Sequence, residues 1–103
     1  MGLVLPERSR RAFDRLIADA KRVFGDRFVA LVAYEAAAGL IFTTAIRPGD
    51  LDALAVLVET WHRDGLRTPL LMTEEEFHRS IDAFPLEYQA IVDRHLVLAG
   101  RSP

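Results

Sequence analysis

The first part of the chain carries its apolar residues with the period of a helix. Between about Pro6 and Phe24 they recur three or four positions apart, so they share one helical face. Pro6 suits a first helical turn, and Gly25 suits the position just after a last one. The pattern therefore predicts an amphipathic helix over about Pro6–Phe24. The apolar face consists of Ala12, Phe13, Leu16, Ile17, Ala20, Val23 and Phe24.

Two short apolar runs follow this helix, Phe28–Tyr34 and Leu40–Ile46. Continuous apolar runs of this length are typical of strands that are covered on both faces. The residues between the runs are too few for a crossover helix, so we expect an antiparallel hairpin. The three alanines Ala36–Ala38 are unusual in a turn, and they also allow the alternative that this segment continues as a helix.

A second helix is predicted after the turn residues Arg47–Asp50. Gly49 or Asp50 is expected to cap it, and Gly65 follows its end at about Asp64. The wide apolar arc predicts that the helix is well buried. Its main face is Leu51, Leu54, Ala55, Val58 and Trp61, and Val56 and Leu57 widen the arc.

Leu70–Met72, after Pro69, is a predicted third strand. Strand, helix and strand in so short a stretch form a βαβ unit. The third strand should therefore run parallel to the second, with a right-handed crossover.

The remaining residues predict two more helices. Thr73 followed by Glu76 forms a capping box, which starts a helix that Pro85 interrupts. Pro85 then opens another helix to about Leu98, and Gly100 ends it. The predicted fold is α/β (α+β): a single domain over residues 1–103, with a small mixed three-stranded sheet and element order α-β-β-α-β-α-α.

Composition and charge exclude several classes of function. The chain has 103 residues, of which half are apolar, and no cysteine, which rules out disulfides, thiol catalysis and thiolate metal sites. The net charge of −2 argues against nucleic-acid binding, although residues 1–27 carry an excess of three positive charges. Glu35 lies near the centre of the apolar stretch Phe28–Ile46 and disfavours a membrane span there. No signal peptide is visible, so we expect a cytoplasmic protein.

Few side chains have a spacing that is typical of catalytic or metal-binding sites. His62, His78 and His95 lie too far apart to share one helical face as metal ligands. Asp50-Leu51-Asp52 matches a D-x-D metal motif, but its place at a helix start favours capping. Glu35 is either a buried acid or a turn residue that reaches solvent, and the cost of an unpaired buried carboxylate favours the turn. We therefore predict no catalytic, cofactor-binding or metal-binding residue, and no cofactor.

Two segments resemble bacterial proteins of the polymerase-β-like nucleotidyltransferase superfamily: Thr68–Tyr88 and Asp93–Gly100. The order of the elements before them is also similar to that superfamily. The resemblance implies a nucleotidyltransferase-like core, with the superfamily's Gly-Ser motif falling at Glu35 and Ala36. Relatives continue into a helical C-terminal domain, which we expect to be absent here.

The departures from the superfamily pattern fall on its active site. The Gly-Ser motif is missing, and Glu35 would repel phosphate. Leu40–Ile46 contains no carboxylate, whereas two-metal phosphoryl transfer requires carboxylate ligands. We therefore expect a degenerate, non-catalytic domain with a structural or protein-interaction role.

The expected partner is a second copy of the chain, in a homodimer formed through a sheet edge or a bare helix face, or else another protein. A nucleotide-binding module without catalysis is the alternative, and a small membrane-associated protein is a weaker one.

Overall fold

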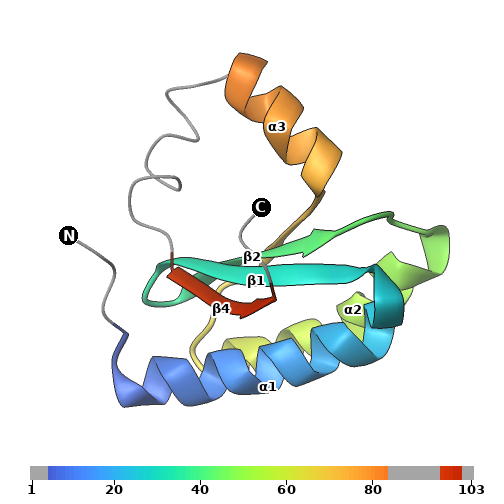
Figure 1. Cartoon of the computed structure of the whole chain (residues 1–103). Helices are drawn as coiled ribbons and strands as arrows, with labels where there is room; N and C mark the ends of the chain where they lie inside the picture. The colour runs from blue at the N-terminus through green and yellow to red at the C-terminus, as the bar shows by residue number, and fades with distance from the viewer. Residues whose placement is uncertain (1–4, 84–95, 101–103) are drawn as a thin grey trace.

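The computed structural model describes residues 5–83 and 96–100, which form helices on both sides of a mixed sheet (Figure 1). The elements are α1 (Glu7–Phe24), the 3-10 turn η1 (Gly25–Arg27), β1 (Phe28–Glu35), β2 (Ala38–Thr43), α2 (Pro48–Arg63), β3 (Leu70–Thr73), α3 (Glu74–Ala83) and β4 (Leu96–Gly100).

The sheet has four strands in the order β3-β2-β1-β4. β1 and β2 are antiparallel, with Leu31 opposite Ile41, so the predicted hairpin is confirmed and the helical alternative is wrong. β2 and β3 are parallel, with Ile41 opposite Leu71, which confirms the parallel pairing of the βαβ unit. The general α/β class is therefore right, but the three-stranded sheet is wrong.

The additional strand is β4, which pairs antiparallel with β1. The sequence predicted a helix to about Leu98, but Leu96–Gly100 is extended. Val97 packs against the core on one face of the sheet and Leu98 against the core on the other, an alternation that only a strand provides. The predicted helix that opens at Pro85 lies outside the described residues before this strand.

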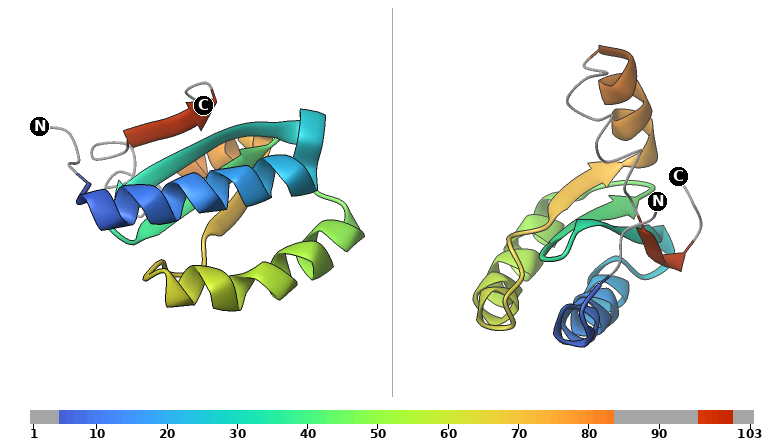
Figure 2. Two further views of the ribbon diagram at one scale, coloured as in Figure 1. Left: turned by 90° about the horizontal axis from the view of Figure 1, so that it is seen from below. Right: turned by 90° about the vertical axis from the view of Figure 1, so that its left-hand side faces the viewer.

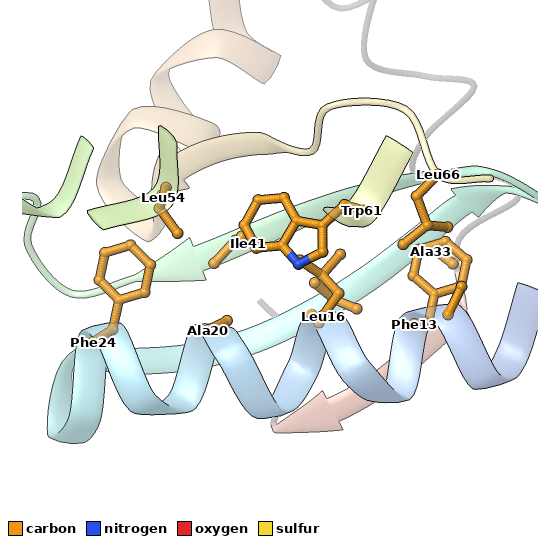
Figure 3. Packing of buried hydrophobic residues seen from close by; sticks show 11 residues of the cluster. Phe13, Leu16, Ala20, Phe24, Ala33, Ile41, Leu54, Trp61 and Leu66 are labelled. Carbon is orange, nitrogen blue, oxygen red and sulfur yellow. The ribbon is translucent and has the colours of Figure 1, made fainter. Parts of the chain in front are cut away.

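Helices α1 and α2 lie together on one face of the sheet, and α3 stands on the other (Figure 2). The apolar stripe of α1 meets β1, β2 and α2 in the larger core (Figure 3). Burial of each large side chain stabilises the fold by about 1.5–3 kcal/mol. This core contains Ala12, Phe13, Leu16, Ala20, Phe24, Leu31, Ala33, Ile41, Leu54, Trp61 and Leu66.

Trp61 fills the space between α1 and α2 and is completely buried. Its indole Nε1 donates a hydrogen bond to Asp19 Oδ2 at 3.0 Å. Beside it, Arg15 on α1 pairs with Asp64, just after α2, with Nε donating to Oδ2 at 2.8 Å. Helices α1 and α2 are thus held together by the buried Trp61 ring and by these two side-chain hydrogen bonds beside it.

The opposite face of the sheet carries a smaller core under α3. Phe77 of α3 meets Phe42 of β2 edge to face, with ring centroids 4.9 Å apart. The predicted capping box starts α3, because Glu76 N–H donates to Thr73 Oγ1 at 3.1 Å and Thr73 N–H to Glu76 Oε1 at 3.4 Å. This end of the helix is therefore fixed to the end of β3.

Helix α2 departs from its predicted start and burial. It begins at Pro48, and its N-cap is Arg47 rather than Gly49 or Asp50. Leu54 and Trp61 are buried, whereas Leu51 is 58% exposed and Val56 is 79% exposed. The apolar arc is wider than the area that the sheet and α1 cover, so an apolar strip remains on the surface.

Candidate functional site

The turn between β1 and β2 is the place where the superfamily resemblance would put a bound phosphate. Only Ala36 and Ala37 lie between the two strands. The Glu35 side chain is 52% exposed, so it reaches solvent as predicted, although Glu35 is the last residue of β1 and not part of the turn. Its Oε2 accepts a hydrogen bond from an Arg67 guanidinium nitrogen at 2.9 Å.

A second bond ties this turn to the connection between α2 and β3. The Arg67 N–H donates to the Ala37 carbonyl at 2.8 Å. Nearby, burial raises the pKa of the Tyr34 phenol, and the Glu35 carboxylate adds to that effect. The end of the hairpin thus presents an ion pair, and the Glu35 carboxylate disfavours a phosphate there.

Strand β2 offers no acid to a metal ion. Its last residue, Thr43, is fully buried, and the hydroxyl has no hydrogen-bond partner in the described part of the chain. Within residues 5–83 and 96–100, no group of three His, Cys, Asp or Glu side chains could hold a metal. Two-metal phosphoryl transfer needs such a group.

Asp50, the first acid of the D-x-D sequence, forms an ion pair with Arg27. Its Oδ1 accepts a hydrogen bond from Arg27 at 2.8 Å, and its Oδ2 accepts one from the Arg47 N–H at 2.6 Å. The Arg27 hydrogen bond holds the pKa of this carboxyl at about 2, well below its usual range. The pair joins the end of η1 to the first turn of α2.

The Arg27–Asp50 pair was missed by the sequence reasoning, which assigned Asp50 only to capping. The capping expectation was close, because Asp50 does bond to the backbone of the N-cap residue. No local spacing connects Arg27 with Asp50, since the two meet only when the chain folds and places the end of η1 beside the first turn of α2. Asp52 is exposed.

Within the described residues, which leave out His95 and Ser102, the histidines and serines are not brought together. The His62 ring Nε2 lies 2.8 Å from Thr68 Oγ1, at the end of α2. The His78 ring lies on α3 beside Phe77, and His95 falls outside the described residues. Ser9 is on α1 and Ser80 on α3, on opposite sides of the sheet.

The exposed side of α2 is the main apolar feature of the described surface. Leu51, Ala55 and Val56 are exposed there, and we call these three residues the α2 outer face. Val56 lies about 200° around the helix from the buried Leu54, so it points away from the sheet. None of the helices in the described residues has the length and apolar content needed to cross a membrane.

No family model, curated protein or solved structure matches this chain.

Proposed function

We propose that this chain is a non-catalytic nucleotidyltransferase-like domain that acts through protein association, with a second copy of itself as the partner. The observation that carries the proposal is the exposure of Leu51 and Val56 on the α2 outer face. Leu51 and Val56 lie about 140° apart around α2, and two large apolar side chains exposed on one helix favour an association surface. The same feature would serve any protein partner, and self-association is the simplest form.

Two features of the hairpin support the absence of catalysis. The Glu35–Arg67 ion pair occupies the end of the hairpin, to which the resemblance assigns the phosphate. Strand β2 carries no carboxylate, so a transferred nucleotide would have no metal ligand from this strand.

The proposed dimer packs α2 against α2 of the second copy. A two-fold axis places the same patch on both sides of an interface, and it can run two such helices antiparallel. The positive N-terminal end of each helix dipole then lies beside the negative C-terminal end of the other, which is electrostatically favourable. Each Val56 and Leu51 would leave water on association, which supplies the driving force.

Analytical ultracentrifugation tests the association. The unmodified protein should be a dimer at high micromolar concentration, and the double variant Leu51→Asp/Val56→Asp should be a monomer with an unchanged circular dichroism spectrum. Leu70→Asp is the matched control, because Leu70 is 43% exposed but lies on β3. A monomeric unmodified protein would refute self-association.

A transfer assay tests the absence of catalysis. Neither the unmodified protein nor the double variant Glu35→Gly/Ala36→Ser should transfer nucleotide to protein, RNA or small-molecule hydroxyls. Restoring the Gly-Ser pair leaves β2 without metal ligands, so activity should stay at the level of heat-killed protein. Metal-dependent labelling above that level would contradict the proposal.

A further inference from the structure

A cleft whose described lining residues are all charged lies where α1 begins and α2 ends. Its volume is about 480 Å³, and a neighbouring cavity of about 240 Å³ shares Arg8 and Asp64 with it. Arg8, Arg11 and Arg15 are spaced three and four residues apart, so they share one side of α1. The lining residues of the larger cleft are Glu7, Arg8, Arg11, Arg15, Arg63 and Asp64.

Positive charge exceeds negative charge in this cleft, with four guanidinium groups against two carboxylates. Arg15 binds both oxygens of Asp64 at 2.8 Å, and Arg11 binds Glu7 at 2.8 Å. Arg63 lies 3.9 Å from Glu59, too far for a hydrogen bond, and Arg8 has no ion pair with any described residue. The guanidinium groups of Arg11 and Arg15 are therefore held in place by carboxylates. Those of Arg8 and Arg63 keep N–H groups that are available to bind a ligand.

We propose that this cleft binds a chain of linked phosphate groups. The planar guanidinium fork matches the oxygens of a phosphate, and Arg8 and Arg63 approach the cleft from two different helices. Every described side chain that lines the larger cleft is charged, so it has no aromatic ring to stack on a nucleobase, and its apolar surface belongs to these same charged residues. The cleft therefore recognises the phosphate chain and is indifferent to what the chain carries.

This site is separate from the hairpin turn and from the α2 outer face. It differs in one further way from a nucleotidyltransferase site, because its described residues include no group of three side chains that could hold a metal. A magnesium ion on the ligand would neutralise the charge that the arginines bind, so magnesium should weaken binding. Arg11 and Arg63 are 70% and 73% exposed, so added salt should weaken binding as well.

Isothermal titration with sodium tripolyphosphate, without magnesium and at low ionic strength, tests the proposal. The double variant Arg8→Gln/Arg63→Gln should bind at least about tenfold more weakly, the equivalent of about 1.4 kcal/mol. The matched control is Arg22→Gln/Arg79→Gln, which removes the same charge from exposed positions outside the cleft and should bind as the unmodified protein does. Glu7→Gln should bind more tightly, because it releases Arg11 and removes a repelling charge.

A second arm uses ATP in place of tripolyphosphate. Equal affinity for the two ligands, reduced by magnesium, supports recognition of the phosphate chain. Tighter binding of ATP that requires magnesium would overturn the proposal in favour of a nucleotide site. The absence of binding at millimolar tripolyphosphate would also overturn it, and so would equal weakening by the two double variants, since that result indicates diffuse attraction only.

Discussion

Among the described carboxyls, that of Asp50 has a pKa well below its usual range. Only 6% of Asp50 is exposed, and it accepts hydrogen bonds from Arg27 and from the backbone of Arg47. Removal of one partner from such a pair leaves the other charge buried, which is costly. The sequence placed Asp50 correctly at the start of a helix, but Arg27 lies at the end of η1 and only tertiary packing brings the two together.

The pair predicts an acid-sensitive step in stability. Because the folded pKa of Asp50 is about 2 and lies below the unfolded value, the folded state binds fewer protons. The resulting stabilisation, about 2 kcal/mol, is complete above about pH 4 and is lost as the pH falls towards 2. Asp50→Asn should lose at least this amount at neutral pH, as measured by urea unfolding.

The dependence of the unfolding free energy on pH below 4 tests whether Asp50 is the group responsible. The stability of Asp50→Asn should fall less steeply between pH 4 and 2 than that of the unmodified protein. Asp52→Asn is the control, because its carboxylate is exposed and close in sequence. Equal slopes for Asp50→Asn and the unmodified protein would mean that another carboxyl carries the effect.

At the scale of elements, the sequence pattern correctly predicted those features that depend on contacts between residues close together in the chain. The capping box at Thr73, the stripe of α1 and the brief hairpin turn all arise from neighbours in sequence, and each was confirmed. β4 was mistaken for the end of a helix because four apolar residues suit either structure. Its partner β1 lies far away in the sequence, so no local pattern could reveal the pairing.

Gly100 limits what β4 can tolerate. Its φ is +79°, and a Cβ at this position would lie 1.9 Å from the Val29 carbonyl oxygen, so Gly100→Ala must shift the strand. The variant should destabilise the protein by at least about 1 kcal/mol in urea unfolding and speed amide exchange along Leu96–Ala99. Gly49→Ala is the matched control, because nothing lies within 4 Å of an added Cβ there. An unchanged rate of amide hydrogen exchange along β4 in Gly100→Ala would contradict the close approach of Gly100 to the Val29 carbonyl.

For the whole molecule, the difference between predicted and observed burial of α2 is informative. The sequence pattern gave an apolar arc, and the sheet and α1 cover only part of it. A single chain cannot reveal how much of an arc its own fold will cover, since that depends on the position of every neighbour. Val56, the most exposed of the large apolar residues in the described part of the chain, is therefore the residue on which the proposed association depends most.

The proposed association through α2 would make the stability of the protein depend on its concentration. A dimer that dissociates on unfolding gains stability by mass action as the protein is concentrated. A hundredfold rise in concentration should raise the melting temperature by about 5 °C for a domain of this size. Calorimetry should show this rise for the unmodified protein and a flat response for Leu51→Asp/Val56→Asp. A flat response for both would contradict a dimer of folded chains.

The position of β4 has a consequence for synthesis of the protein. β1 is flanked by β2 on one side and β4 on the other, yet β4 is the last described element to be translated. At about 5–20 residues per second, the ribosome needs roughly 3–12 s to proceed from the end of β1 to the start of β4. Throughout this interval the nascent chain keeps one edge of β1 open, over the uncharged segment Ala30–Ala33 that β4 later pairs with. A pause in translation or a premature stop before Leu96 would prolong that exposure and favour pairing between neighbouring nascent chains.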